Sequence, residues 1–599
     1  MRRSPVAAFA SLALLCLILA PQSAVAADFA KARVQGVMDR ALRLEVQRAI
    51  GVTKSRPTTR IDARRRARDA GESVIAVLRS EGYYDYLVEP DVGEGDTPDP
   101  LVRITLGPRS TFAPPKLVWD GPPPDDVSAT TAEMALALPP GGPGRAADVL
   151  AAEGRAVSAL QKRGFADAAA RPRQVVVDHA DHSVEPTFNI AAGELVHMDG
   201  LKVVTEGRTN PAWVATLASW KKGSAYNPDK VAQLEQRLRD VGVYSSVTVS
   251  LATADQAVNG LRPVVVSLGD RPPHTIELGA DYSTSEGAGV DAKWILYNRL
   301  RRADTLTLTA RLAQIQQKLD VELDLPDWRR GDQTLKLGAD IFSDLTKGYD
   351  DAGLGLRADV ERHWTKTTYL TLGAAFDIAE TREKTAINVN GLPVGQTLKL
   401  AIPSLLAAFA LDRSNDPLNP TRGWRLQAQA EPTFITGDRT LAYVKVQAQV
   451  SGYLPLKSDA STVLAGRIKF GSILGGNIPT VPSDRRFFAG GGGSIRGYNY
   501  QGVGLKLSDG TPVGGASLFE SSFEVRQKVV GPWSMAAFID AGALGQDVMP
   551  DFRQIAVGAG LGVRYNLGFA PIRVDIATPL DRHKGDPILQ LYLSIGQSF

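Results

Sequence analysis

The residue types that most often carry chemistry are scarce here and poorly placed for catalysis. Histidine occurs six times in 599 residues. His179 and His182 have an H-x-x-H spacing found in metal sites, but their polar surroundings favour a solvated loop. No serine lies in a G-x-S-x-G elbow with plausible partners, and the acids Asp125 and Asp126 follow a proline run. The sequence therefore predicts no enzyme, no catalytic residue, no metal site and no cofactor.

A glycine-rich stretch with one central arginine is more informative. Residues 487–498 read Phe-Phe-Ala-Gly-Gly-Gly-Gly-Ser-Ile-Arg-Gly-Tyr and lie in a long segment, about 474–514. A phosphate-binding loop is disfavoured, because no Lys-Ser/Thr follows and no βα unit surrounds it. Two interpretations stay open: a mobile surface loop, or a loop that folds back against a wall, which glycines permit. In the second case Arg496 would be buried and would need an anionic partner.

The segment lies in a half of the chain with strand periodicity. From about residue 275, apolar and polar residues alternate, as in Ala442 to Ser451 and in Leu589 to Gly596. About 16 such segments occur, with strands of the length that suits a tilted crossing of a bilayer. A soluble β-sandwich also alternates, but it rarely needs so many strands. Because backbone groups in lipid must all be paired, we predict a closed 16-stranded antiparallel transmembrane barrel.

The preceding half mixes helices and strands and repeats about every 80 residues. In each unit a leucine lies four residues before a helix-ending glycine, and an aromatic residue follows. The pairs are Leu78 and Gly82, Leu160 and Gly164, and Leu238 and Gly242. Three small α+β modules in a row are therefore predicted.

The first residues read as an export signal. Arg2 and Arg3 precede an apolar run, and Ala24-Val25-Ala26 resembles a cleavage site. Cys16, the only cysteine, lies in this segment, so we expect no disulfide. The later sequence has no run of ~18 apolar residues, which argues against a helical membrane protein. The net charge of +3 gives no electrostatic argument for nucleic acid.

These observations divide the chain into five expected parts. They are a signal peptide (1–26), three modules (27–107, 108–193 and 194–271) and the barrel (272–599) with an inward loop at about 474–514.

Several segments resemble the BamA/TamA superfamily of outer-membrane barrels, including the two-partner-secretion pores. Ile495-Arg496-Gly497-Tyr498 is similar to its lid-loop signature, and Phe538-Ile539-Asp540-Ala541-Gly542 to the partner motif on the second strand after that loop. Residues 411–416 and 420–423 resemble a turn in the middle of such barrels, and Tyr282-Ser283-Thr284 with Tyr297-Asn298 resembles their first hairpin. The modules resemble POTRA domains, whose order is β-α-α-β-β. The resemblance covers essentially the whole mature chain.

The resemblance implies a lid loop held in the barrel. Arg496 would pair with Asp540 and with Glu524 on the preceding strand. The expected lid residues are Gly490, Gly491, Ile495, Arg496, Gly497 and Tyr498, and the expected wall residues are Glu524, Phe538, Asp540 and Gly542.

Closing the barrel pairs its first and last strands, about Thr275–Tyr282 with Gln590–Phe599. Gly279 and Gly596 would weaken this seam, because glycine contributes no side-chain packing. Tyr282 and Phe599 complete the expected seam residues. An opened seam would expose strand edges that template another strand. Ordinary closure stays open as the alternative.

The expected function is outer-membrane insertion of unfolded barrel or autotransporter clients through this seam. Three modules and about 16 strands resemble the TamA branch. That branch implies a TamB-like partner anchored in the inner membrane, and periplasmic modules. The alternatives are an export pore for a single secreted protein and, less favoured, a plain porin, which would lack the modules.

Overall fold

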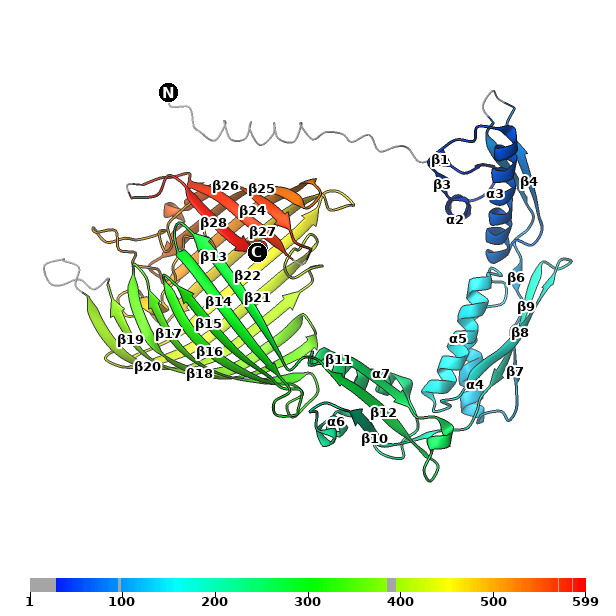
Figure 1. Cartoon of the computed structure of the whole chain (residues 1–599), viewed down its shortest axis with the longest axis horizontal. Coiled ribbons are helices and arrows are strands. Elements are labelled where there is room, and N and C mark those ends of the chain that lie inside the picture. The colour runs from blue at the N-terminus through cyan, green and yellow to red at the C-terminus, as the bar shows by residue number, and fades with distance from the viewer. Residues whose placement is uncertain (1–28, 95–97, 385–394, 569, 584) are drawn as a thin grey trace.

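The computed structural model describes residues 29–94, 98–384, 395–568, 570–583 and 585–599. The expected signal peptide, residues 1–26, lies outside these ranges. Within them, the chain forms an arm of small α/β modules followed by a closed antiparallel barrel of sixteen strands (Figure 1). The expected fold class is confirmed.

Each arm module has the order β-α-α-β-β. In each, the strand directly before the first helix pairs in parallel with the last strand, which pairs antiparallel with the strand after the second helix; the first module also has two short strands that pair with each other. Module 1 contains β1 (Phe29–Ala30), β2 (Arg33–Gln35), α2 (Arg40–Ile50), β3 (Val52–Thr53), α3 (Arg60–Ser80), β4 (Tyr86–Val92) and β5 (Pro100–Leu106). Module 2 contains β6 (Thr111–Phe112), β7 (Lys116–Trp119), α4 (Asp126–Leu136), α5 (Ala146–Lys162), β8 (Ala169–Asp178) and β9 (Ser183–Ala191). Module 3 contains β10 (His197–Thr205), α6 (Pro211–Leu217), α7 (Pro228–Asp240), β11 (Tyr244–Leu251) and β12 (Leu261–Asp270).

The repeated leucine and glycine explain how the second helix of each module packs and ends. Leu78, Leu160 and Leu238 are fully buried against their sheets. The glycine two residues after each helix has a positive φ, a conformation that costs glycine little. These values are 87° at Gly82, 109° at Gly164 and 72° at Gly242.

The barrel strands pair in chain order from β13 to β28. They are β13 (His274–Ser283), β14 (Gly287–Tyr297), β15 (Thr305–Ala313), β16 (Gln316–Leu325), β17 (Gln333–Leu345), β18 (Tyr349–Thr365), β19 (Thr368–Glu383), β20 (Gln396–Asp412), β21 (Gly423–Gly437), β22 (Leu441–Pro455), β23 (Thr462–Leu474), β24 (Ser517–Val530), β25 (Trp533–Gly545), β26 (Ala556–Asn566), β27 (Pro571–Pro579) and β28 (Gln590–Ile595).

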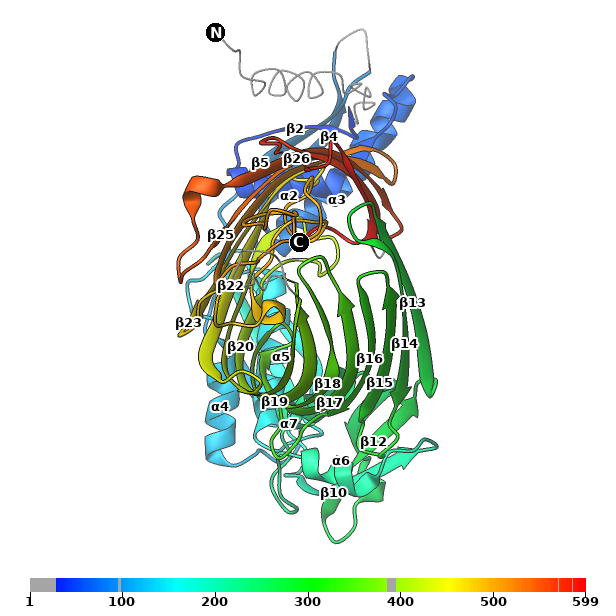
Figure 2. The ribbon, with the colours of Figure 1, turned by 90° about the vertical axis from the view of Figure 1, so that its left-hand side faces the viewer.

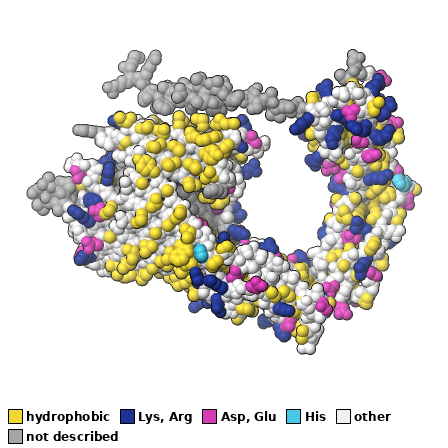
Figure 3. Space-filling view, in the orientation of Figure 1, with side chains coloured by type: hydrophobic (Ala, Val, Ile, Leu, Met, Phe, Trp, Pro, Cys, Tyr) yellow, Lys and Arg dark blue, Asp and Glu magenta, His cyan; other side chains and the backbone are white. Residues whose placement is uncertain are grey.

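Alternation along the strands separates an apolar outer face from the lumen. Leu312, Leu561 and Ile595 are 63%, 55% and 57% exposed on the outer wall, whereas Tyr592 is buried inside. Apolar side chains accordingly cover much of the visible barrel surface (Figure 3). A bilayer would cover this face. Separately, no helix in the described ranges is long and apolar enough to cross a membrane.

Module 3 is joined to the barrel through the turn between β14 and β15, at the lower ends of the first strands (Figure 2). Ala303 of this turn is 1% exposed and belongs to the hydrophobic core of module 3. Asn298 donates to Thr209 Oγ1 at 2.8 Å, and the Asn210 amide donates to the Arg301 carbonyl at 2.9 Å. The turn between β14 and β15 therefore packs into the hydrophobic core of module 3.

Candidate functional site: the lid and the seam

The long segment between β23 and β24, residues 475–516, folds into the lumen and is called the lid here. Ile495 and Tyr498 are 0% and 3% exposed. They share a hydrophobic cluster with Val481 and Phe487 of the lid and with Leu398 of the barrel wall. The sequence left open a mobile surface loop or a loop that folds back against a wall. In the structure the loop folds back against the inner wall of the barrel.

Arg496 of the lid is bound by carboxylates from three different strands. Its guanidinium forms two bonds with Asp540 of β25, from Nε at 2.7 Å and from Nη2 at 2.9 Å. Its Nη1 lies 3.0 Å from Asp575 of β27 and 3.4 Å from Glu524 of β24. The guanidinium carbon also lies 3.3 Å from the centroid of the Phe538 ring. The structure thus brings the lid arginine together with the wall residues that the resemblance named.

The network continues through further arginines of the wall. Arg564 contacts Asp575 and donates to Glu524 at 3.1 Å, and Arg526 donates to Glu524 at 3.2 Å. All three carboxylates are at most 1% exposed. Arg573 Nε also lies 3.6 Å from Asp575, so four arginines face three carboxylates, and each buried carboxylate has at least one arginine partner when the lid is in place.

Close backbone approach explains the glycines of the motif. A Cβ on Gly497 would lie 2.7 Å from the backbone carbon of Thr578, and one on Gly542 would collide with Ile495. Gly490 and Gly491 have φ values of 106° and 103°. The Gly497 amide also donates to the Tyr592 hydroxyl at 3.0 Å, which joins the lid to the last strand.

A second group of contacts holds the other end of the lid. Arg485 lies 3.1 Å from Asp377 of β19, and Arg486 lies 3.5 Å from Glu383 at the end of β19. The Ser483 amide also donates to Glu383 at 3.0 Å. Because Arg496 binds β24, β25 and β27, the lid joins separate parts of the wall. This second anchor was not predicted.

The seam between β13 and β28 has little backbone pairing. Within the described residues the two strands share two pairs, Tyr282 with Leu593 and Ser283 with Tyr592. Thr284 adds backbone and side-chain bonds to Leu591 and Gln590. By contrast, β19 and β20 pair from Thr368 to Glu383. Residues 274–281 of β13 pair with β14 and have no ladder partner in β28.

The expected alignment of the two seam glycines is wrong. Gly279 pairs with Asp291 of β14, whereas Gly596 lies beyond the end of β28 and donates to the Pro571 carbonyl. Its φ of 93° turns the chain away from the strand direction. Of the expected seam residues, Tyr282 lies in the seam, and Gly279, Gly596 and Phe599 do not pair across it.

The last residues, 597–599, lie in the lumen and are called the tail here. Ser598 donates to Glu524 at 2.9 Å, and Gln597 donates to Asn419 in the turn between β20 and β21 at 3.0 Å. The Phe599 ring stacks on Tyr453, and the Arg467 and Arg526 guanidinium groups lie 5.6 and 5.5 Å from its centroid. The lid and the tail therefore share Glu524.

The two histidines with H-x-x-H spacing do not form a metal site in the described part of the chain. His179 and His182 both bind Asp85 of module 1, with Nδ1 to oxygen distances of 2.7 and 3.0 Å. No group of three His, Cys, Asp or Glu residues that could hold a metal ion occurs in the part of the chain that the structure describes.

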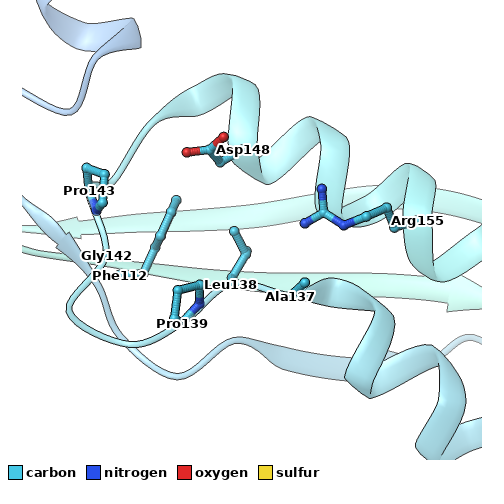
Figure 4. A pocket seen from close by; sticks show the side chains of 8 residues that line it. All are labelled: Phe112, Ala137, Leu138, Pro139, Gly142, Pro143, Asp148 and Arg155. Carbon is cyan, nitrogen blue, oxygen red and sulfur yellow. The ribbon is translucent and has the colours of Figure 1, made fainter.

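A pocket of about 470 Å³ in module 2 lies between the α4–α5 connection and α5 (Figure 4). Its walls are largely Phe112, Leu138 and prolines. The Arg155 side chain at its edge donates to the Ala135 carbonyl at 3.0 Å. The arginine thereby supports the end of α4, and the pocket brings no nucleophile and base together.

Comparison with known proteins places the chain in a family. Residues 298–599, just over half of the chain, match the Omp85 superfamily domain. The chain is 20% identical over 444 residues to the outer membrane protein assembly factor BamA of Neorickettsia risticii (strain Illinois), covering 70% of this chain and 57% of that protein. It is 21% identical over 470 residues to the BamA of Neisseria meningitidis serogroup B (strain ATCC BAA-335 / MC58), covering 73% and 57%. The chain thus spans little more than half the length of these curated relatives.

A solved structure shares the fold. BamA from Haemophilus ducreyi lacking POTRA domains 1–3 superimposes with a TM-score of 0.66 at 18% identity, over 81% of this chain and 100% of that one. Together with the apolar outer wall, these findings place the barrel in an outer membrane and the arm in the periplasm. Because the superfamily domain accounts for half of the chain, this protein belongs to the Omp85 superfamily.

Proposed function

We propose that this protein is an outer-membrane assembly factor that inserts β-strands of unfolded clients through the seam between β13 and β28. The observation that carries the proposal is the seam itself, with two residue pairs in the described chain. Separating two pairs costs far less than separating the long ladder between β19 and β20. Opening leaves two unpaired edges in lipid, where an unpaired backbone group is costly. A client strand that pairs with an edge removes that cost, so no nucleotide is required.

Reversible closure of the seam tests the proposal. Cysteines replacing Tyr282 and Leu593 face each other across it. In liposomes with an unfolded barrel client, oxidation should abolish insertion and reduction should restore it. Cysteines replacing Ala428 and Ala448, which pair between β21 and β22, give the matched control, in which oxidation should leave insertion unchanged. Insertion at the normal rate with the seam oxidised would exclude lateral opening.

The client range separates an assembly factor from an export pore. Depletion of this protein from cells should lower the amounts of several outer-membrane barrel proteins in a membrane proteome. The reason is that a seam that binds clients through backbone hydrogen bonds does not select strongly by side chain. Loss of one exported protein with all barrels retained would instead support the pore.

We further propose that the protein acts as a TamA-type factor on autotransporter clients with a TamB-like partner. The support is the set of three modules in the described arm, each with free sheet edges. Strand β8 is one such edge: it pairs with β9 alone in its sheet, and nine of its ten residues are exposed. Photocrosslinkers placed along β8 should capture an inner-membrane-anchored protein in cells. Crosslinks to outer-membrane lipoproteins alone would favour a BamA-type role.

A further inference from the structure

The barrel wall has a second weakly paired interface, between β20 and β21. Their register is constant, with Ala401 opposite Thr436, Ser404 opposite Thr433 and Ala407 opposite Ala430. The positions between these three pairs are not paired, although both strands continue through them. The break therefore comes from missing ladder hydrogen bonds and not from a shift of register.

Two prolines account for the break. Pro403 of β20 and Pro432 of β21 fall at the unpaired positions, and proline has no N–H to donate to a ladder. On their other sides the same residues are paired, Pro403 with Phe376 and Pro432 with Val444. The weakness is thus confined to one interface, near the middle of both strands.

A groove of about 560 Å³ opens at this break. Its outward walls are Pro403, Leu405, Pro432, Phe434, Val444 and Leu474. Leu405, Phe434 and Leu474 are 58%, 47% and 45% exposed, which assigns the groove to the membrane face. None of the groove-lining residues carries a charge.

The groove is closed on its luminal side. Ile402 and Ile435, which alternate with the outward residues, are 1% and 0% exposed. They belong to one hydrophobic cluster with Val481 and Phe487 of the lid. A molecule in the groove must therefore come from the bilayer and not from the lumen.

We propose that this groove is a binding site for one acyl chain of an outer-membrane lipid. An uncharged groove at mid-height of the wall gives a lipid head group no partner, whereas an acyl chain matches its apolar walls. Lipid surrounds the barrel on this face, so entry gains little from the hydrophobic effect, and retention comes from close packing in the groove. The site is independent of the proposed insertion activity.

The position of the site gives it a mechanical consequence. Strands β13–β20 lie on one side of the break and β21–β28 on the other, so the break and the seam divide the barrel into two halves of eight strands. When the seam widens, the interface with missing ladder pairs is where the wall bends. An acyl chain in the groove acts at this hinge.

Photolabelling tests the site directly. The full chain is placed in lipid nanodiscs containing a phosphatidylethanolamine with a diazirine in one acyl chain, irradiated, and analysed by peptide mass spectrometry. Labels should concentrate on Leu405, Phe434 and Leu474 at least several-fold above other outward residues. Uniform labelling of the outer wall would overturn the proposal.

Filling the groove supplies the matched comparison. Leu405→Trp should lower labelling of the remaining groove residues several-fold, and Leu474→Trp, from β23, should do the same if the first variant does not fold. Leu561→Trp on β26 is the control, because the wild-type leucine is similarly exposed at 55%. This substitution should leave the labelling of the groove residues unchanged. Equal losses in the Leu405 and Leu561 variants would contradict a built site.

Repairing the ladder tests the hinge. Pro403→Val combined with Pro432→Val restores both missing donors, and should abolish the concentrated label and slow client insertion severalfold. Loss of label with a normal insertion rate would retain the lipid site and reject the hinge. Retained label would reject the site whatever happens to insertion.

Discussion

At the scale of single residues, Arg496 matters because all of its partners lie on the wall and none lies in the lid. Asp540, Asp575 and Glu524 come from three strands, and the guanidinium also contacts Phe538. One buried charged side chain therefore links the lid to three strands of the wall. Breaking such a buried pair costs about 3–5 kcal/mol.

We predict that Arg496→Glu releases the lid. The substitution brings a fourth carboxylate against three buried ones, so the inward position loses its attraction and gains repulsion. Protease added outside cells should then cleave between Gly475 and Ala516. Arg553→Glu, in the loop between β25 and β26, is the control, because this side chain is 90% exposed and pairs only locally with Asp551. Unchanged protection in the Arg496 variant would contradict the role of this network.

The sequence predicted part of this network for a definable reason. Arg496 and Asp540 lie in motifs, and the resemblance adds Glu524 on the strand before the second motif, so all three were located. Asp575 and Arg564 lie in ordinary alternating strands, where an inward charge looks like any residue of a wet lumen. Asp575 lies between the apolar residues Val574 and Ile576, and this alternation does predict that its carboxylate points into the lumen. The alternation cannot predict that Arg496 and Arg564 bind it.

At the scale of elements, the turn between β14 and β15 is the joint between module 3 and the first hairpin of the barrel. Asn298, Arg301 and Ala303 all have positive φ values, which non-glycine residues adopt at a cost. Asp304 offsets this cost by accepting hydrogen bonds from the amides of Arg299 and Leu300. The first hairpin of the barrel and module 3 should therefore move as one body.

We predict that Ala303→Asp loosens this joint while the barrel stays folded. A carboxylate placed at this 1%-exposed position in the core of module 3 should destabilise the contact by on the order of 3 kcal/mol. Spin-label distances between α7 and the turn after β18 should broaden. Asn298→Ala, which removes the bond to Thr209 and the acceptor of the Ala303 amide, should destabilise the contact by about 1–3 kcal/mol. A narrow distance distribution in both variants would show that other contacts hold the arm.

The tail is a second such element, because it fixes the chain directly after β28 against the wall. We predict that Phe599→Ala widens the seam, because the ring loses its contacts with Tyr453, Arg467 and Arg526. Spin labels on Ile276 and Val574, both exposed on the outer face, should report a broader distance distribution. Leu567→Ala, in the turn after β26, should leave that distribution as in the parent protein. No change with Phe599→Ala would assign seam closure to the pairs of Tyr282 and Ser283 and the bonds of Thr284.

The tail also shows where periodicity stops being predictive. Alternation continues through Leu589, Leu591, Leu593 and Ile595, and the expected strand therefore ran on to Phe599. The positive φ of Gly596 ends the strand, and only tertiary contacts with Asn419 and Glu524 fix where the tail goes. A pattern of polar and apolar residues determines the face of a strand, not the point where the chain leaves the sheet.

At the scale of the whole molecule, the arm has ionic contacts at each junction between modules. Glu81 of module 1 binds Arg145 of module 2 at 2.9 Å, and Asp167 of module 2 binds Arg262 of module 3. Repeat periodicity predicted the modules, but it could not predict these junctions, because each joins residues from different repeats. These ion pairs hold neighbouring modules against each other.

The junction between modules 2 and 3 should respond to acid. The hydrogen bond from Arg262 holds the pKa of Asp167 below its ordinary value of 3.8, so the carboxylate is favoured in the docked state. The stabilising contribution is fully present above pH 3.8 and is lost as the pH falls through the lowered pKa. Small-angle X-ray scattering of the detergent-solubilised protein should show a more extended arm as the pH falls below 3.8 and through the lowered pKa of Asp167. Asp167→Asn should show that flexibility already at pH 7 and no further change at this junction in acid. A wild-type arm that stays compact through this range would mean that the backbone bond from Val196 to Gly164 and the Lys162–Asp229 pair suffice to hold the junction.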